Sequence, residues 1–164
     1  MPLGLQGLKK MALEEYNTRR DFSKTNEPAG TLKKPGKEPI FVVQKHNASH
    51  LHYDLRLEID GVLKSWAVPK EPPAEEGVKR LAVETEDHPL EYGSFEGVIS
   101  EGEYGAGTVE IWDKGVFTPE KISEKEILFQ LSGKKLSGNY VLVKLKPTPR
   151  FPGEKNWLFF RKKG

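Results

Sequence analysis

The chain has 164 residues, of which 36% are hydrophobic and 30% charged, with a formal net charge of +2. These values suit one compact folded domain and exclude a disordered tail. No cysteine is present, so disulfides, thiolate zinc sites, iron–sulfur clusters and cysteine nucleophiles are excluded. Because the sequence offers neither a secretory signal nor an apolar stretch long enough for a bilayer, we expect a cytoplasmic protein.

Charge is unevenly distributed along the chain. Residues 71–110 contain eleven acidic residues against Lys79 and Arg80, whereas residues 144–163 carry seven basic residues against Glu154. A basic surface can face a polyanion such as nucleic acid, but it can equally be a solvated face without a partner. Charge alone therefore leaves nucleic-acid binding open.

The first predicted element is a short helix. Leu8, Met11, Leu13 and Tyr16 follow a helical spacing, and residues 1–19 are expected to form a flexible or helical segment. Residues 23–39 are rich in Asn, Pro, Gly and Lys, which is typical of a loop leading into a core. We expect one domain from residue 20 to residue 164.

Short strands are predicted from residue 40 onward, where β-branched and aromatic runs alternate with Gly and Pro. Residues 122–131 fit neither period and could form a short helix or another strand. The pattern favours a mainly β fold, a small single-domain barrel or sandwich with short flanking helices. The expected strands are 40–45, 51–59, 62–68, 80–86, 107–112, 116–118, 139–146 and 157–161.

The segment 50–59 alternates strictly between apolar and polar residues. Side chains alternate between the faces of a strand, so Leu51, Tyr53, Leu55, Leu57 and Ile59 share an apolar face. The opposite, polar face carries the remaining residues of the segment, which are His50, His52, Asp54, Arg56 and Glu58. We predict that one face is core and the other bears the chemistry.

A tight hairpin should follow this strand, because Asp60-Gly61 is a favoured two-residue turn. Counting back from the turn places Ser65 opposite Arg56 and Ala67 opposite Asp54. Trp66 and Val68 then fall on the apolar face, opposite Leu55 and Tyr53. Small neighbours on the polar face predict a hollow above His52, Asp54 and Arg56.

Three of the four histidines, at positions 46, 50 and 52, lie within seven residues. Two imidazoles with Asp54 would give a two-nitrogen, one-oxygen set for a divalent transition metal, with open positions typical of catalysis. An isolated His-x-Asp on a strand is more often an ordinary surface feature. Arg56 on the same face favours a site, because a guanidinium grips phosphate oxygens well.

A series of motifs runs along the chain, beginning with Arg20-Asp21-Phe22, Thr25 and Glu27-Pro28, followed by FVVQKH at 41–46, LHYDLRLE at 51–58, GVLKSWAVPK at 61–70, VKRLAV at 78–83, EDHPL at 86–90, FEGVI at 95–99 and GEYGAGTV at 102–109. Together these motifs closely resemble the 3′-phosphoesterase domain of the bacterial repair enzyme DNA ligase D. The resemblance covers residues 20–161, which is nearly the whole chain.

This resemblance implies a small β-barrel whose hollow holds one manganese ion, with His46, His52 and Asp54 as ligands and His50 at the rim. It implies that Arg56, His88 and Tyr92 act on the scissile phosphate. It also implies a set of residues that orient the ligands or hold the substrate, namely Arg20, Asp21, Glu27, Gln44, Lys70 and Arg80.

The implied substrate is a primer–template 3′ end that carries a terminal ribonucleotide or a 3′-phosphate. A diesterase step would remove the ribonucleoside and a monoesterase step the phosphate, leaving a 3′-hydroxyl for repair. Ligase and polymerase modules are absent from this sequence, so we expect the protein to meet them as separate chains or to work alone, and we expect a monomer.

Two other classes of function compete with this interpretation. His52, Asp54 and His88 imitate the two-histidine, one-carboxylate triad of iron oxygenases. A non-catalytic barrel that stacks bases on exposed aromatic side chains is the other alternative. Arg56 beside the metal disfavours the first, and the inward alternation of the aromatic residues disfavours the second.

Overall fold

The computed structural model describes residues 38–100, 102 and 106–163. The predicted helix near the N-terminus, most of the loop at 23–39 and the domain boundary at residue 20 lie outside the described residues. Within the described part, no helix is long and apolar enough to cross a membrane.

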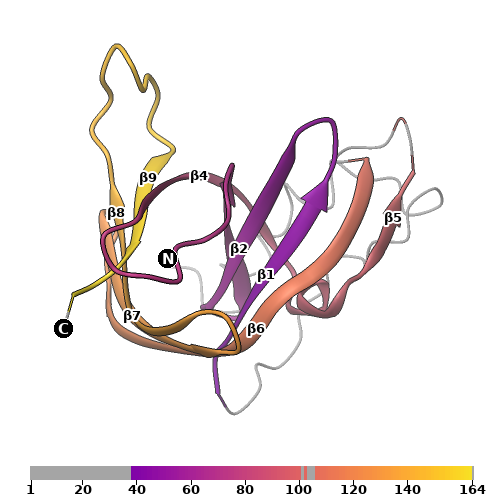
Figure 1. The fold of residues 1–164 in the computed structure, drawn as a ribbon, viewed down its shortest axis with the longest axis horizontal. Coiled ribbons are helices and arrows are strands. Elements are labelled where there is room, and N and C mark those ends of the chain that lie inside the picture. Colours follow the sequence, from indigo (N-terminus) through magenta and orange to yellow (C-terminus); the bar gives the residue numbers. More distant parts are fainter. Residues whose placement is uncertain (1–37, 101, 103–105, 164) are drawn as a thin grey trace, which may run out of the picture.

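Eight antiparallel strands close into a barrel, which the pairing of β1 with β6 completes (Figure 1). The ninth strand, β5, pairs with the start of β6 outside this ring. The neighbours around the barrel are β1-β2-β3-β4-β9-β8-β7-β6. The elements are β1 (Ile40–Asn47), β2 (Leu51–Ile59), β3 (Val62–Val68), β4 (Lys79–His88), the 3-10 helix η1 (Leu90–Ser94), β5 (Gly97–Ile99), β6 (Gly107–Ile122), β7 (Glu126–Gly133), β8 (Ser137–Lys144) and β9 (Asn156–Arg161).

The predicted fold class, a small mainly β barrel, is confirmed, and η1 is the one helix in the described residues. The structure joins the two strands expected at 107–112 and 116–118 into β6, because the intervening residues stay paired with β1. Of the ambiguous residues 122–131, Ile122 ends β6, residues 123–125 form the turn and residues 126–131 belong to β7. The short strand β5 was not predicted.

The hairpin between β2 and β3 has the predicted register. Asp60 and Gly61 both have positive φ, at 55° and 80°, as a two-residue turn of this twist requires. Ile59 pairs with Val62, and the row continues to Arg56 opposite Ser65 and Asp54 opposite Ala67. The turn chemistry therefore fixes which side chains face each other across these strands.

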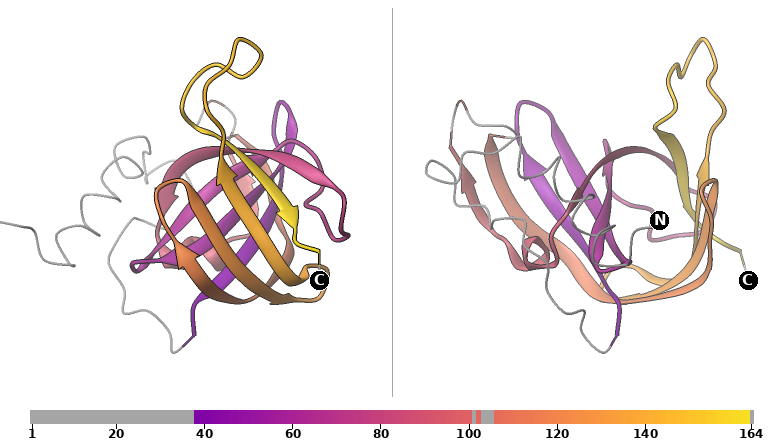
Figure 2. Two further views of the ribbon diagram at one scale, coloured as in Figure 1. Left: turned by 90° about the vertical axis from the view of Figure 1, so that its left-hand side faces the viewer. Right: turned by 180° about the vertical axis from the view of Figure 1, so that it is seen from behind.

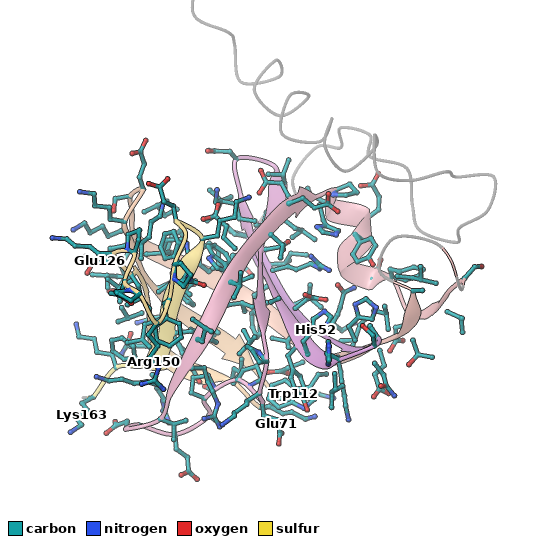
Figure 3. The ribbon with its side chains drawn as sticks, turned by 90° about the horizontal axis from the view of Figure 1, so that it is seen from above. His52, Glu71, Trp112, Glu126, Arg150 and Lys163 are labelled. Carbon is teal, nitrogen blue, oxygen red and sulfur yellow. The ribbon has the colours of Figure 1, made fainter. Side chains whose placement is uncertain are left out.

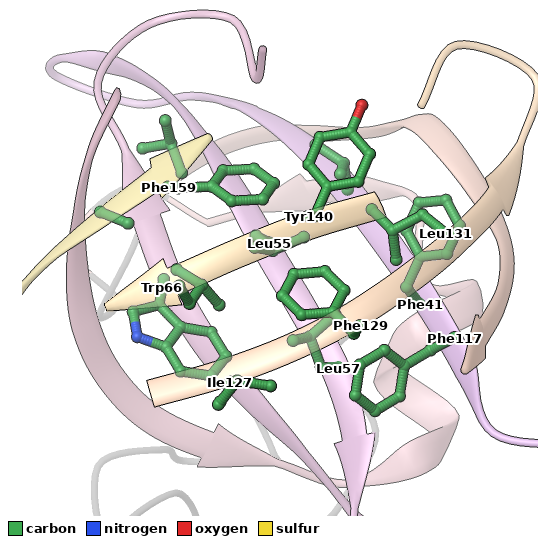
Figure 4. Close-up of a cluster of buried hydrophobic side chains, with 14 of the residues drawn as sticks. Phe41, Leu55, Leu57, Trp66, Phe117, Ile127, Phe129, Leu131, Tyr140 and Phe159 are labelled. Atoms are coloured by element: carbon green, nitrogen blue, oxygen red, sulfur yellow. The ribbon is translucent and has the colours of Figure 1, made fainter. Parts of the chain in front are cut away.

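Apolar side chains from all eight barrel strands fill the interior, and all the strands except β4, which contributes Ala82, supply large ones (Figure 4). Phe129 at the centre is 1% exposed and packs near Phe117, Tyr140 and Phe159. Burial raises the pKa of Tyr140 to about 12, and its hydroxyl donates to the Pro73 carbonyl. The barrel therefore encloses a packed core.

The candidate site lies on the outer face of the barrel, which corrects the expectation of a metal in its hollow. Tyr53, Leu55 and Leu57 of β2 point into the core, and the alternate residues Asp54 and Arg56 point outward. Alternation along β2 is thus confirmed. Leu51 is an exception to the predicted apolar face, because at the start of the strand it is 45% exposed.

Candidate metal and phosphate site

Three side chains with metal-ligating atoms meet where β1 and β2 run side by side. His46 pairs directly with His52 across the two strands, and Asp54 follows two residues later on the same face. Asp54 Oδ2 lies 3.6 Å from His46 Nδ1 and 3.3 Å from His52 Nε2. The three ligating atoms lie within 4.8 Å of one another.

A backbone carbonyl orients the ring of His52. The Nδ1 atom of His52 lies 3.0 Å from the carbonyl oxygen of His50, which can only accept a hydrogen bond. This partner favours a proton on Nδ1 and leaves the Nε2 lone pair directed toward Asp54 and the shared centre. His50 thus contributes its backbone to the geometry, while its own side chain is exposed.

The electrostatics of the cluster keep Asp54 ionised. Burial pushes its pKa upward, but Arg56, His46 and His52 outweigh this effect and hold the pKa of the carboxyl well below its ordinary value. The hydrogen bond with Asp54 in turn raises the pKa of His52, against the opposing effect of burial. A negative oxygen is therefore available between two imidazoles.

This donor set fits a small divalent cation. Two imidazole nitrogens and one carboxylate oxygen are the ligand types of borderline transition metals, and three protein ligands leave positions for water or substrate. His52 is the most exposed of the three, with 25% of its side chain accessible against 9% for the other two. Ligand entry is therefore expected past His52.

Arg56 stands beside this cluster as a buried, oriented cation. Its Nε donates to Gln44 Oε1 at 2.6 Å and its Nη1 to Ser65 Oγ at 2.8 Å. Its Nη2 lies 3.6 Å from Asp54 Oδ2. Among the described residues Nη2 has no hydrogen-bond partner, so its N–H groups are the ones that a phosphate oxygen could use.

His88 and Tyr92 pack against the guanidinium of Arg56. His88 Nδ1 lies 3.0 Å from Arg56 Nη1 and 3.0 Å from the Glu86 carbonyl. The ring of Tyr92 lies 4.8 Å from Arg56 Cζ and 4.7 Å from the His88 ring. The structure thus brings the three residues predicted to act on phosphate into one contact group.

Gln44 is enclosed in this group, with no exposed surface. Its Nε2 donates to the carbonyls of Tyr92 and Phe95 at 2.7 and 3.1 Å, while its Oε1 accepts from Arg56. One amide therefore ties the η1 segment to the arginine. These contacts assign Gln44 to positioning within the fold.

The remaining predicted residues lie apart from this group or outside the described residues. Lys70 is exposed and follows β3 near the end of the sheet where His52 lies, since Val68 pairs with Tyr53. Arg80 shares a face of β4 with the core residue Ala82, and its Nε donates to the Glu71 carbonyl at 2.8 Å. Arg20, Asp21 and Glu27 are outside the described residues.

Sequence reasoning noted Ser65 only as a small neighbour of Arg56. Its Oγ accepts from Arg56, donates to the Leu63 carbonyl at 3.0 Å and lies 3.4 Å from His88 Nδ1. The predicted register placed it opposite Arg56, and that was the signal from which its role could have been found.

The geometry does not form the triad of His52, Asp54 and His88 on which the iron-oxygenase alternative was argued. Among the described residues, the group that could share a metal consists of His46, His52 and Asp54. His88, which the alternative requires as a ligand, contacts the arginine instead. A permanent cation at that position is a poor neighbour for a further metal ligand.

The sequence profile of the DNA ligase D 3′-phosphoesterase domain matches residues 44–144 of the chain. The chain belongs to this family. The match begins at Gln44 and includes the candidate ligands, Arg56, His88 and Tyr92.

Similar proteins include the multifunctional non-homologous end joining protein LigD of Pseudomonas aeruginosa, which is 52% identical over 141 residues, with 80% of this chain and 16% of the relative covered. The non-homologous end joining DNA repair protein LigD of Mycobacterium tuberculosis is 50% identical over 80% of this chain and 18% of the relative. LigD of Mycolicibacterium smegmatis is 47% identical over 92% of this chain and 20% of the relative. The chain thus spans a fifth or less of the length of these relatives.

Proposed function

We propose that the protein is a manganese-dependent phosphoesterase that heals 3′ ends of nucleic-acid strands for repair. On primer–template ends it would remove a terminal ribonucleoside in a diesterase step and then the 3′-phosphate in a monoesterase step. Family membership supports this proposal, as does the name of its relatives as end joining proteins.

The observation that carries the proposal is the contact between a candidate metal cluster and an oriented guanidinium. Arg56 Nη2 and the atoms of His46 and His52 approach the same carboxylate oxygen, Asp54 Oδ2, at 3.6, 3.6 and 3.3 Å. A phosphate placed there would meet two positive centres, as hydrolysis of a charged ester requires.

Each residue has a proposed role in that chemistry. A divalent cation held by His46, His52 and Asp54 would supply Lewis-acid charge to the phosphate oxygens when bound. Arg56 would clamp a non-bridging oxygen, and His88 would hydrogen-bond the phosphate or protonate the departing oxygen. Tyr92 holds the guanidinium against its ring.

The surrounding residues would hold the substrate or orient these groups. Lys70, which is exposed, would meet a phosphate near His52, and Gln44 would orient Arg56. Arg80 and three residues outside the described part, Arg20, Asp21 and Glu27, remain proposed contacts by family resemblance. We propose that the protein acts as a cytoplasmic monomer.

The test uses an end-labelled DNA primer with one 3′-terminal ribonucleotide, annealed to a template and incubated with the protein and Mn²⁺. We expect a product one nucleotide shorter that ends in a 3′-phosphate, followed by one that ends in a 3′-hydroxyl. Polynucleotide markers with defined ends distinguish the two products on a sequencing gel. The proposal would be refuted if the protein removed neither the terminal ribonucleoside nor the 3′-phosphate with any divalent metal.

A further inference from the structure

The loop between β8 and β9, residues 145–155, projects from the barrel in every view (Figures 1 and 2). Lys146, Arg150 and Lys155 in this loop are exposed, and Glu154 is its one acidic residue. These basic residues account for part of the positive charge near the C-terminal end of the sequence. The active-site chemistry described above uses none of them.

The loop is held in a defined shape. Phe151 N donates to Thr148 Oγ1 at 3.0 Å, and Thr148 N donates to the Phe151 carbonyl at 3.1 Å. Arg150 Cζ lies 5.4 Å from the centre of the Phe151 ring, so the aromatic side chain supports the guanidinium. Three prolines, at 147, 149 and 152, restrict the backbone further.

The base of the loop is fastened to the strands beside it. Glu84 N donates to the Lys155 carbonyl at 2.7 Å, and Leu145 N donates to the Asn156 carbonyl at 2.8 Å. The side chain of Asn156 donates to the Pro152 carbonyl at 3.1 Å. The base of the loop is thus fixed relative to β4.

Strand pairing connects the strand end from which the loop projects to the candidate metal site. Asp54 pairs with Ala67, Ala67 with Val83, and Val83 with Asn156, so one row crosses β2, β3, β4 and β9. Trp157 points into the core, which places Asn156 on the outer face together with Asp54. β4 lies between His52 and Arg150 in the view of Figure 3.

Beyond Asp54, no residue of this row carries a charge. Ala67, Val83 and Asn156 are half-buried, and the adjacent outward pair, Leu81 and Leu158, is also half-buried and apolar. Three strand spacings amount to roughly 14 Å along the sheet. That length corresponds to about four base pairs of duplex.

We propose that the β8–β9 loop is a second nucleic-acid contact, which binds the sugar-phosphate backbone at least about four nucleotides from the 3′ end held at the metal site. The assignment rests on the proposed function for the identity of the bound end. Its physical basis is a basic, preorganised loop joined to the site by a neutral outer surface, so that phosphates are attracted at the two ends of the strip.

The test compares a Lys146→Ala/Arg150→Ala variant with a charge-matched control, Lys121→Ala/Lys134→Ala, whose exposed lysines lie on β6 and after β7. Binding to a 12-base-pair duplex labelled at one 5′ end, which leaves the 3′ end of the same strand free, is measured by fluorescence anisotropy at several salt concentrations. For the loop variant we expect roughly tenfold weaker binding at low salt and a log–log salt slope smaller by about 2. The control should match the wild-type protein.

Activity separates this proposal from the proposed function. On the duplex the loop variant should show a raised KM with an unchanged kcat, and on a three-nucleotide single strand, too short to reach the loop, it should equal the wild-type protein. If the wild-type protein processed no 3′ end, the proposed function would be wrong. The anisotropy measurement of duplex binding would still test the role of the loop. Equal affinity and equal salt slope for loop variant and wild type would overturn the loop assignment.

Discussion

At the scale of single residues, each of two neighbouring histidines has a distinct position. His52 points into the cluster with Asp54, whereas His50 is exposed and contributes its carbonyl. We expect His52→Ala or Asp54→Ala to abolish manganese binding and both esterase steps, and His50→Ala to retain them. Calorimetric titration with Mn²⁺ and the end-labelled primer assay measure the two properties. Near-normal turnover of His52→Ala would remove the ligand assignment.

Arg56 allows metal binding to be separated from phosphate binding. It is not in the ligand set, so Arg56→Ala should still bind manganese while losing about a hundredfold or more in kcat/KM. Lys45→Ala is a suitable control, because this lysine lies on β1 and pairs with Glu110 4.0 Å away. If Arg56→Ala kept its fold by circular dichroism but no longer bound the metal, metal binding and phosphate binding would not be separable at this residue.

The raised pKa of His52 gives the metal affinity a pH dependence. Because the bond with Asp54 raises this pKa above 6.5, the imidazole keeps its proton to a higher pH than an ordinary histidine. A metal must displace that proton, so affinity for Mn²⁺ should rise as pH rises through and above 6.5. Titrations in buffers of different ionisation enthalpy report the released proton. An affinity that is constant from pH 6 to pH 8 would contradict the prediction.

At the scale of elements, the β2–β3 hairpin could be predicted from the sequence. The short elements β5 and η1, including the Tyr92 ring that lies over Arg56, could not. Asp60-Gly61 determines the turn, and period two then places Ser65 and Ala67. β5 and η1 carry no comparable signal, because they are short and their order depends on contacts with β6 and Gln44. The burial of Gln44, on which its positioning role depends, is likewise a tertiary property.

Gln44→Glu tests how η1 is held. The substitution keeps an acceptor for Arg56 Nε but removes both hydrogen bonds to the carbonyls of Tyr92 and Phe95. We expect retained manganese binding, a lower kcat at little-changed KM, and a stability loss of about 1–3 kcal/mol. Gln130→Glu, at an exposed position of β7, is the matched control. Wild-type kcat in Gln44→Glu would show that the link to η1 does not position Arg56.

At the scale of the whole molecule, the packed interior sets stability. Phe129 contacts aromatic residues from β6, β8 and β9 across the barrel. Phe129→Ala should therefore cost about 3–5 kcal/mol of unfolding free energy. Val98, which is 57% exposed, offers a control whose change to Ala should cost within about 0.5 kcal/mol. Denaturant unfolding gives both values, and similar midpoints for the two variants would contradict this account of the core.

The cluster that binds Arg56 and the proposed metal is drawn mostly from one unbroken meander, β1–β2–β3, residues 40–68. His46 and Asp54 are only eight positions apart, so their meeting requires the closure of a short loop, with little loss of chain entropy. A cation captured at this stage would favour the native register of the meander before the C-terminal strands seal the barrel. If the site binds a metal, metal supply during synthesis would then affect how quickly the newly made chain reaches its native form.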